Sequence, residues 1–454
     1  MTDAELVARY DGRAPRYTSY PTAPHFSAAV GPETYADWLA ALPARTSLSL
    51  YLHVPFCDRL CHYCGCNTTV VRLDSSRRAY AALLEREVDR VADLVGGKRL
   101  SVSHVHWGGG TPTALPGDCL SAVMARIRDR FVLAPEAEIA IELDPTKLPE
   151  DRIAALAQMG LTRVSLGVQD LEPAVQEAIG RRQTYEQTRA CAQTARSLGV
   201  ASLNLDLIYG LPLQTEESVG RTARRALELQ ADRVAVFGYA HVPWMKKHQM
   251  LIAEKSLPGP LERFVQQRAI HRVLVEEGGY VPVGLDHYAL PEDAMAKAAS
   301  ARALKRGFQG YTTDDAPVLI GFGASAIGAL PQGYVQNAPI APAYSKAIGE
   351  ERLAVVRGRA LTTDDRLRRE IIERLMCDLE VDLPEIAKAH GADLAPLVAN
   401  IAGVAPFAAD GLAHWDGRRL VVSEKGRPFL RSLAALFDAY LTQDAGMPRH
   451  SRAV

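Results

Sequence analysis

Four of the seven cysteines lie within ten residues of one another, in the segment HVPFCDRLCHYCGCNT (53–68). Cys57, Cys61 and Cys64 have the spacing C-x3-C-x2-C, which lets one short loop place three thiolates around one metal centre. Structural zinc sites usually take four ligands in two separated pairs, and ferredoxin-type clusters usually take four cysteines. Three ligands would leave one iron open for catalysis, although Cys66 could be a fourth ligand. The loop predicts a metal centre, with a redox-sensing loop as the less favoured interpretation.

A second motif, HWGGGTPT (106–113), contains three consecutive glycines after a β-rich run. Glycine has no side chain, so the backbone at this motif can approach a ligand closely. The motif lacks the GxGxxG pattern of dinucleotide-binding proteins, and a tight turn between a strand and a helix would also explain it. Alone, it is a weak indication of a ligand site.

Polar residues follow the later β-rich runs of the chain, at or just past the end of each run. Glu142 stands in IELDPT, Gln169 in SLGVQD and Asp206 in LNLDLIYGLP, and residues 239–241 follow the sixth run. In parallel α/β sheets, ligands bind at the carboxyl ends of the strands. Together with the cysteine loop and the glycine motif, these positions predict one continuous site along one edge of a sheet.

Aromatic and basic residues near the cysteines are harder to interpret. Tyr51 and His53 are two residues apart on a predicted strand, so their side chains point to the same face. Their closeness to Cys57 leaves a functional role and a place in the core equally open. Tyr63 stands between two clustered cysteines and could shield a metal or stack on a ligand. Arg181, in IGRRQT, would by itself be a solvated surface charge.

The elements that must position these residues alternate along the chain from about residue 48 to 285. Short β-rich runs followed by longer helical patterns are typical of βαβ units and a parallel sheet. Six units in succession predict a full or partial (β/α) barrel, because sequential strands tend to be neighbours, and a doubly wound open sheet is the alternative. The predicted strands are 47–54, 101–107, 138–143, 163–169, 202–210 and 233–239.

The remainder of the chain changes in character. Residues 307–340 are rich in Gly, Thr, Pro and aromatic residues, which predicts ordered loops. From Thr362 the pattern becomes helical, and a strand pair at 413–423 precedes a last helix to about residue 441. Helices followed by a small β wing resemble a winged-helix unit. The absence of excess basic charge favours a helical lid over a DNA-binding module.

Composition and charge narrow the class of protein. Of the 454 residues, 48% are hydrophobic and 23% are charged, as in ordinary globular proteins, which excludes disordered and collagen-like chains. The net charge of −1 argues against a general nucleic-acid or membrane-surface binder. Seven cysteines are too few for a disulfide scaffold, and neither a signal peptide nor a membrane-spanning apolar run is visible. We therefore expect a protein of the reducing cytoplasm.

The cysteine segment, with its full spacing C-x3-C-x2-C-x-C, resembles that of the oxygen-independent coproporphyrinogen III oxidases, a family of radical S-adenosylmethionine (SAM) enzymes. The resemblance continues in order along nearly the whole chain. GCNT (65–68) and GFQGYTT (307–313) are more specific to the family than the cysteine triplet, which the superfamily shares. The other matching motifs are RYTSYPTAPHF (16–26), HWGGGTPT, IELDPT, LGVQD, IGRRQT, LNLDLIYGLP, FGYAHVPW, GLDHYALPED (284–293) and ALTTDDRLRREII (360–372).

The resemblance implies an α/β fold, namely a partial (β/α)6 barrel of the radical SAM type with an N-terminal arm and a mostly helical C-terminal domain. We expect five parts in the chain. They are an N-terminal arm (1–46), a catalytic partial barrel with the iron–sulfur cluster (47–290), connecting loops that complete the active site (291–360), a helical, winged-helix-like domain (361–445) and a tail (446–454).

The resemblance also implies the cofactors and the residues that hold them. A [4Fe–4S] cluster is expected on Cys57, Cys61 and Cys64, with Cys66 as the family's extra, non-ligating cysteine, together with two SAM molecules. The first SAM implies contacts from Tyr51, Gly109, Glu142 and Ile327, of which Tyr51 and Glu142 are the expected catalytic residues. The second SAM implies contacts from Tyr63, where the family usually has Phe, and from Gly110, Thr111, Gln169, Arg181, Asp206 and Ala240.

The implied reaction converts two propionates of coproporphyrinogen III to vinyl groups and gives protoporphyrinogen IX, through a 5′-deoxyadenosyl radical derived from SAM. A one-electron reductant such as a flavodoxin is the expected protein partner, with no nucleic acid, no membrane and a monomeric state. Arg16 is a candidate partner for the substrate's propionates. Two alternatives stay open: a haem-binding or haem-delivery relative of the same superfamily, and a structural zinc protein with an interaction module.

Overall fold

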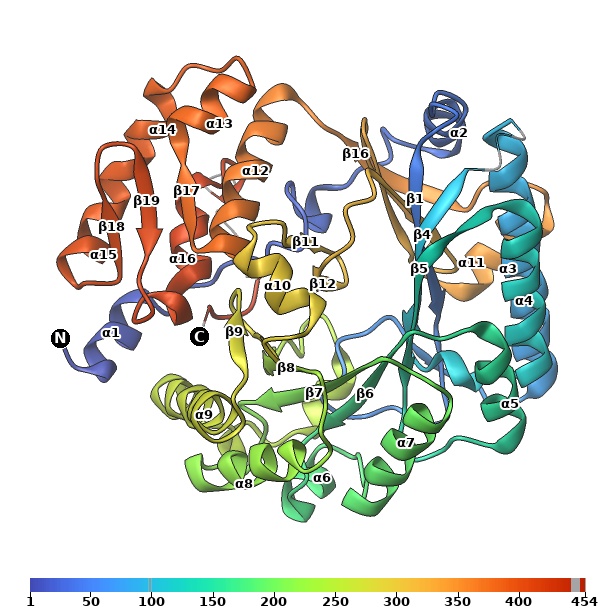
Figure 1. The fold of residues 1–454 in the computed structure, drawn as a ribbon, viewed down its shortest axis with the longest axis horizontal. Coiled ribbons are helices and arrows are strands. Elements are labelled where there is room, and N and C mark those ends of the chain that lie inside the picture. The colour runs from blue at the N-terminus through green and yellow to red at the C-terminus, as the bar shows by residue number, and fades with distance from the viewer. Residues whose placement is uncertain (97, 99, 442–449, 454) are drawn as a thin grey trace.

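Six parallel strands form the centre of the largest sheet in the computed structural model, which describes residues 1–96, 98, 100–441 and 450–453. The strands are adjacent in chain order: β1 (Ser47–Val54), β4 (Ser101–Gly109), β5 (Val132–Leu143), β6 (Arg163–Gln169), β7 (Ser202–Tyr209) and β8 (Arg233–Gly238). Helices cover their outer face (Figure 1): α3 (Asp74–Leu94), α4 (Gly117–Arg130), α5 (Glu150–Met159), α6 (Pro173–Ala178), α7 (Tyr185–Ser197), α8 (Glu216–Leu227) and α9 (Pro260–Arg272). The predicted succession of six βα units is confirmed.

The sheet is open, with twelve strands, because shorter strands extend it at both edges. On one side, β10 (His287–Ala289) and β9 (Val281–Val283) continue from β8 in antiparallel order. On the other side, β13 (Val318–Phe322) pairs in parallel with β1. It is followed by the antiparallel strands β14 (Ile327–Leu330), β15 (Gly333–Asn337) and β16 (Val355–Ala360). The central strands therefore form part of a barrel wall rather than a closed barrel.

The expectation of loops over residues 307–340 is wrong, because β13, β14 and β15 lie within that range. Glycines there serve close strand packing as well as turns. A Cβ on Gly321 would lie 2.7 Å from the carbonyl oxygen of Ile327, and a Cβ on Gly333 would clash with that of Arg359. A composition rich in glycine therefore hid an extension of the sheet.

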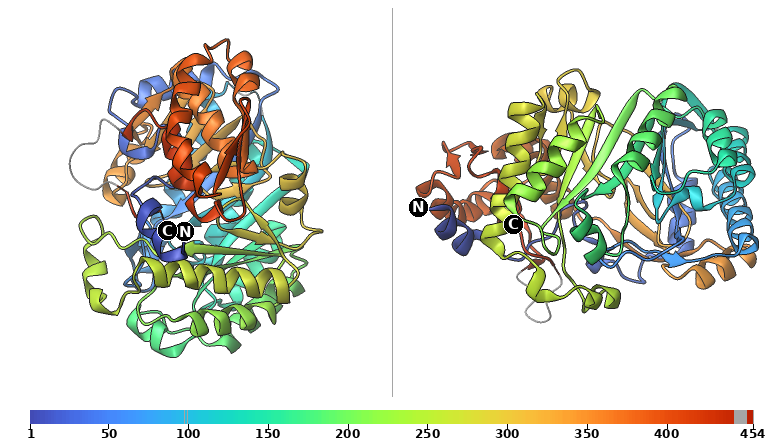
Figure 2. Two further views of the ribbon diagram at one scale, coloured as in Figure 1. Left: turned by 90° about the vertical axis from the view of Figure 1, so that its left-hand side faces the viewer. Right: turned by 90° about the horizontal axis from the view of Figure 1, so that it is seen from below.

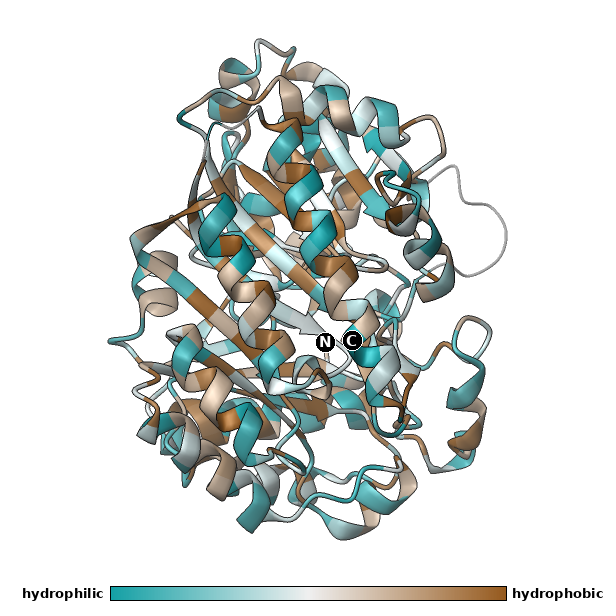
Figure 3. Cartoon of the chain, turned by 90° about the vertical axis from the view of Figure 1, so that its right-hand side faces the viewer, coloured by the Kyte–Doolittle hydropathy of each residue, from teal (hydrophilic) through white to brown (hydrophobic). Residues whose placement is uncertain are grey.

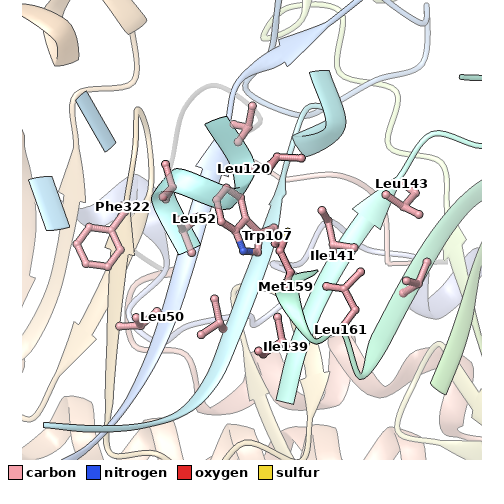
Figure 4. Close-up of a cluster of buried hydrophobic side chains, with 14 of the residues drawn as sticks. Leu50, Leu52, Trp107, Leu120, Ile139, Ile141, Leu143, Met159, Leu161 and Phe322 are labelled. Atoms are coloured by element: carbon pink, nitrogen blue, oxygen red, sulfur yellow. The ribbon is translucent and has the colours of Figure 1, made fainter. Parts of the chain in front are cut away.

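The main core lies between the sheet and its covering helices. Trp107 of β4 is fully buried there among side chains from β1, α4 and β5, including Leu52, Leu120 and Ile141 (Figure 4). Hydrophilic and hydrophobic stretches alternate along the helices that cover the sheet (Figure 3). This pattern is expected of helices that pack one face on a sheet and leave the other in water. Burial of the strands on one face leaves their carboxyl ends available for polar groups.

The C-terminal part is mostly helical and has a separate core. Its helices are α12 (Thr363–Asp378), α13 (Leu383–Ala389), α14 (Ala395–Asn400), α15 (Ala405–Ala409) and α16 (Leu430–Ala434). The predicted strand pair is present as β18 (Ala413–Trp415) and β19 (Arg419–Val422), and β17 (Glu380–Asp382) adds a third strand. The expected helix to residue 441 is wrong in length, because α16 is short and a 3-10 turn ends at Phe437.

The remaining elements connect these two parts. The N-terminal arm contains α1 (Asp3–Tyr10) and α2 (Pro32–Ala40), and Tyr10 packs against Phe407 with ring centroids 4.3 Å apart. Between the sheet and the C-terminal part lie α10 (Ala294–Ser300) and the hairpin of β11 (Lys305–Gly307) and β12 (Gly310–Thr312). The helix α11 (Ala341–Gly349) instead packs against α3, and β2 (Phe56–Cys57) pairs with β3 (Thr69–Val70) beside the cysteine loop. No helix among the described residues has the length and apolar character needed to cross a membrane.

The N-terminal arm lies beside the C-terminal part (Figure 2), and the last described residues of the chain pair with this arm. Arg452 forms an antiparallel bridge with Arg13, and the backbone N–H of Ala453 donates to the carbonyl of Gly12 at 2.7 Å. Within the predicted tail (446–454), residues 450–453 are therefore fixed against the N-terminal arm by hydrogen bonds. The rest of that tail lies outside the described residues.

Candidate active site

A cavity of about 1000 Å³ opens at the carboxyl ends of the parallel strands. Twelve of the fourteen predicted site residues line it: Cys57, Cys61, Tyr63, Cys64, Gly109, Gly110, Thr111, Glu142, Gln169, Arg181, Asp206 and Ala240. Tyr51 and Ile327 do not line it. The predicted edge of the sheet is therefore a single concave site, assembled from residues that lie up to 183 positions apart in the sequence.

The cysteine loop is held from outside by the segment that follows β8. Three loop carbonyls accept hydrogen bonds from side chains of that segment: Tyr63 from Gln249 at 2.9 Å, Cys64 from His248 at 2.7 Å, and Cys66 from Lys246 at 2.9 Å. On its inner side, the backbone N–H of His62 donates to the carbonyl of Ile179 at 2.9 Å. These contacts fix the loop by its backbone and leave its thiols available for ligation.

The three thiols of the triplet are free and differ in their surroundings. The Thr68 hydroxyl donates to Cys57 Sγ at 3.1 Å, and Arg181 Nη1 donates to Cys61 Sγ at 3.7 Å. Burial raises the pKa of Cys57 and of Cys61, so these thiolates need a cationic partner. Iron would supply that charge, because coordination deprotonates a thiol.

The spacing of the thiols distinguishes between an iron–sulfur cluster and a single metal ion as the group they could hold. No three His, Cys, Asp or Glu side chains in the described part of the chain converge closely enough to hold one metal ion. A four-iron cluster contributes its own sulfides and spans its cysteine ligands more widely. The triplet on one wall of a large cavity therefore fits an iron–sulfur cluster better than a structural zinc ion.

The glycine motif brings backbone against the cysteine loop. A Cβ on Gly110 would lie 2.7 Å from both the carbonyl oxygen of Phe56 and the hydroxyl of Thr68, and 3.1 Å from Cys57 Sγ. Gly109 has φ +113°, a backbone conformation that residues other than glycine rarely adopt, and a Cβ there would meet the His53 ring. The motif therefore does more than form a tight turn, because it allows β4 to end against the metal loop.

Each oxygen of the Glu142 carboxylate has one hydrogen-bond partner in the chain. Its Oε1 is 3.2 Å from Nε2 of His106, and its Oε2 accepts from the backbone N–H of Gly109 at 3.3 Å. The side chain is 41% exposed, so its remaining acceptor positions face the cavity. Tyr51 lies behind this group, stacked on His106 with ring centroids 5.8 Å apart and hydrogen-bonded to His53 at 3.1 Å. Tyr51 therefore supports Glu142 through His106.

Arg181 lies in the site rather than on the surface. Its side chain is 10% exposed, Nη2 donates to the carbonyl of Gly167 at 2.8 Å, and Asp144 lies at 3.4 Å. Its Nε has no hydrogen-bond partner among the described residues. Gln169 beside it has φ +67°, at a register shift between β6 and β7. Such strained backbone clusters at functional sites.

Asp206 lies deeper in the cavity. It accepts hydrogen bonds from the Ser165 hydroxyl at 3.0 Å and from Asn204 Nδ2 at 2.8 Å. Burial and the charge of Glu142 raise its pKa above the usual aspartate value. A cationic group in the cavity would stabilise the ionised form of Asp206 and so be attracted to it.

The predictions from sequence missed several residues that shape the site. Thr68, His106 and Asp144 contact the thiols, Glu142 and Arg181 respectively. All three stand inside the motifs GCNT, HWGGGTPT and IELDPT, next to residues that were predicted. Ser165 and Asn204 could have been found from strand alternation, because Asn204 is two residues before Asp206 on β7.

Comparison with protein families matches two parts of the chain. Residues 51–226 match the model of the radical SAM superfamily, and residues 361–429 match that of the HemN C-terminal domain. The first match contains the cysteine loop and most cavity residues. The second covers most of the C-terminal helices and the small sheet.

Several characterised proteins are similar over the full chain. An oxygen-independent coproporphyrinogen III oxidase of Bradyrhizobium diazoefficiens is 50% identical over 99% of this chain and 100% of its own. One of Escherichia coli is 40% identical over 100% of this chain and 98% of its own. The solved structure of coproporphyrinogen III oxidase (HemN) from Escherichia coli, described as a radical SAM enzyme, superposes with a TM-score of 0.88, 39% identity and coverage of 94% of this chain and 97% of that one.

Proposed function

The chain belongs to the oxygen-independent coproporphyrinogen III oxidases of the radical SAM superfamily, and we propose that the cavity residues described above carry that family's reaction. The enzyme decarboxylates two propionate side chains of coproporphyrinogen III to vinyl groups, which gives protoporphyrinogen IX. Each conversion removes one hydrogen atom, one electron and CO2 from a propionate. When bound, the [4Fe–4S] cluster and SAM supply the 5′-deoxyadenosyl radical that takes the hydrogen atom.

The observation that carries the proposal is the convergence of three free thiols and nine other predicted residues on one cavity. Cys57, Cys61 and Cys64 would hold the cluster, and the cavity walls would exclude water from the radical chemistry. The test is product analysis under strict anaerobiosis with coproporphyrinogen III, SAM and a one-electron reductant. The proposal predicts protoporphyrinogen IX and CO2, whereas haem binding without CO2 release would support a haem-delivery role instead.

At the first SAM molecule, Glu142 is the group that would accept hydrogen bonds from ribose hydroxyls or an amino group. The hydrogen bonds of its two oxygens with His106 and Gly109 hold the carboxylate in place. Tyr51 is a positioning residue in this proposal, because it reaches Glu142 through His106. Ile327 would act from the neighbouring edge, since its carbonyl lies against Gly321, the β13 residue paired with Tyr51.

A second SAM molecule is proposed beside the first. Arg181 would pair with its carboxylate, Asp206 would meet a cationic group, and the remaining contacts would come from Tyr63, Gly110, Thr111, Gln169 and Ala240. The unpartnered Nε of Arg181 and the raised pKa of Asp206 support this assignment. Equilibrium dialysis with labelled SAM should find two molecules per chain, and one molecule for Asp206→Ala. A wild-type ratio of one would contradict the second site.

Electrons would enter from a one-electron reductant such as a flavodoxin, through the segment that fixes the cysteine loop. Trp244, Met245, Met250 and Leu251 are exposed there, at 42%, 60%, 73% and 66%. Lys246 and Lys247 stand among them, so the surface combines apolar and cationic groups and complements an acidic carrier.

The reductant surface can be tested by charge reversal. We expect Lys247→Glu to lower turnover with a flavodoxin severalfold and leave turnover with dithionite unchanged, because Lys247 lies outside the cavity lining. Lys388→Glu, an exposed lysine on α13, is the matched control. Equal losses with both reductants would contradict the surface.

The compartment and the oligomeric state are proposals of the same kind. Seven free cysteines support a reducing environment, and we propose the cytoplasm. We propose a monomer, because one chain supplies every residue assigned to the cavity. Light scattering of the reconstituted protein at micromolar concentration checks this, and a mass of two chains would contradict it.

A further inference from the structure

A second, smaller cavity of about 40 Å³ adjoins the main one, and Arg16, Gly238 and Tyr239 line both. Five arginines from distant parts of the chain line the smaller cavity: Arg16 from the N-terminal arm, Arg263 from α9, Arg306 from β11, Arg431 from α16 and Arg452 near the C-terminus. We call it the arginine cavity. Its position beyond the end of β8 places it next to the carboxyl edge that forms the active site.

The arginine cavity is cationic. Asp286 is the one acidic side chain among its described lining residues, and it lies 4.0 Å from Arg306. Burial would raise the pKa of Asp286, but the hydrogen bond from His287 and the charges of Arg306 and Arg16 lower it to about 2. Burial and the charges of Arg16 and Arg306 lower the pKa of Arg431 to about 9. One carboxylate therefore faces several guanidinium groups that repel one another.

The acceptors of two of these arginines are uncharged. Arg16 donates to the carbonyl of Gly238 at 2.8 Å, and its side chain stays accessible because it lines the main cavity. Arg431 is buried and donates to the carbonyls of Ala14, Pro15, Arg452 and Ala453 and to the Ser451 hydroxyl. These hydrogen bonds position the arm and the tail but supply no negative charge.

Arg306 has one hydrogen-bond donor without an acceptor at the arginine cavity. Its side chain is 4% exposed, and its Nε and Nη2 donate to the carbonyl of Arg16 at 3.3 and 3.0 Å. Its Nη1 is buried without a hydrogen-bond partner among the described residues. A buried guanidinium N–H left unpaired costs free energy that an anionic acceptor would recover.

We propose that the arginine cavity binds one carboxylate of the substrate, on a propionate arm that is not decarboxylated. The proposal rests on the proposed function and adds to it the group that orients the substrate. A volume of about 40 Å³ exceeds what one water needs and suits a group of three heavy atoms. Arg16 faces both cavities, so a tetrapyrrole in the main cavity can extend one arm into the smaller one.

The chemistry distinguishes a retained arm from a reacting one. A carboxylate that leaves as CO2 must give up its negative charge. Guanidinium groups around a carboxylate stabilise that charge and so oppose its loss. The arginine cavity is therefore suited to hold a propionate that survives the reaction, while another arm of the same substrate reaches the radical.

Two ligands separate these roles in an experiment. Coproporphyrinogen III has four propionates, and mesoporphyrinogen IX keeps only the two that the reaction spares. We would measure KM and kcat for the first, and the Kd of the second by anaerobic equilibrium dialysis, on reconstituted holoenzyme. Arg306→Gln and Arg16→Gln should each raise that KM and that Kd about tenfold or more, with kcat changed much less. Arg306→Lys, which keeps the charge, should recover part of the loss.

The controls address folding and the proposed function. Arg352→Gln alters an exposed arginine paired with Glu350 and should change neither constant. The Arg16 variant keeps the result decisive if Arg306→Gln unfolds, because the Arg16 side chain is accessible. An increase in the KM of coproporphyrinogen III without an increase in the Kd of mesoporphyrinogen IX would assign the cavity to a reacting propionate. No change in either constant would overturn the proposal, and so would a failure of mesoporphyrinogen IX to bind. If the wild-type enzyme binds mesoporphyrinogen IX but releases no CO2 from coproporphyrinogen III, the proposed function fails while the proposed role of the arginine cavity stands.

Discussion

Buried polar groups behave differently under the covering helices and in the cavity. Glu87 of α3 is 3% exposed, and its carboxylate accepts from the Gly323 backbone N–H, the Tyr344 hydroxyl and Asn337 Nδ2, each at 2.7 Å. In the main cavity the Arg181 Nε, and in the arginine cavity the Arg306 Nη1, have no partner among the described residues, and the Glu142 side chain is 41% exposed. The Glu87 carboxylate is satisfied within the chain, whereas the cavity groups retain capacity for ligands.

This difference separates polar groups that maintain the fold from those that bind. Native proteins pair most of their buried polar groups, so unpaired groups that gather in one place require an explanation. Two of the unpaired groups here, the Nε of Arg181 and the Nη1 of Arg306, line the cavities at the carboxyl ends of the parallel strands, where α/β proteins bind their ligands, whereas others, such as the Nε1 of Trp107, lie in the core. Substitutions under the helices should therefore change stability, and substitutions in the cavity should change binding and turnover.

The largest effect is expected at the cysteine loop. Serine at Cys57, Cys61 or Cys64 should abolish turnover and cluster assembly, because three ligands leave none to spare. Iron and sulfide analysis with EPR of anaerobically reconstituted protein checks this. Cys66→Ser should retain the cluster, and loss of the cluster in that variant alone would show that the ligand assignment is wrong.

Glu142 should have the next largest effect. Glu142→Ala removes an oriented acceptor from the cavity and should lower kcat/KM by about 10³-fold, with little change in the midpoint of thermal unfolding. Glu136→Ala, at an exposed position on the same strand, is the control. A loss of stability that matched the loss of activity would assign Glu142 to the fold instead.

Glu87 should change stability with pH. Burial raises its pKa from 4.5 to about 7, despite the hydrogen bonds from Gly323, Tyr344 and Asn337. The folded protein therefore holds a proton that the unfolded chain releases above pH 4.5. The free energy of unfolding should fall by about 3 kcal/mol as pH rises from 4.5 to 7. Denaturant unfolding of Glu87→Gln should lack this component, and identical pH profiles would contradict the raised pKa.

The smallest effect is expected at a helix end in the C-terminal part. The Thr362 hydroxyl accepts from the backbone N–H of Asp365, whose carboxylate accepts from the Thr362 N–H. Thr362→Ala should cost about 1 kcal/mol of stability and leave turnover per folded molecule unchanged. Urea denaturation with an activity assay checks both, and a change in KM would show that this region communicates with the cavity.

The sequence predicts the central strands well because each has a local apolar pattern. The strand over 163–169 agrees at both ends, and the polar residues at the strand ends converge as predicted. The sheet extension was missed because glycines at close strand contacts, such as Gly321 and Gly333, resemble those of loops. The arginine cavity has no local pattern in the sequence, since its five arginines meet only through the tertiary fold.

The hydrogen bonds of Arg431 have a consequence for biosynthesis. They join residues 14 and 15 to residues 452 and 453, so the arginine cavity is closed by both ends of the chain. During translation, the cysteine loop emerges from the ribosome long before the last of these residues. A nascent chain can therefore form the cluster-binding loop early but completes the arginine cavity only after residue 453 has left the exit tunnel. The proposed propionate site is therefore complete only when the N-terminal arm and residues 452 and 453 are both in place.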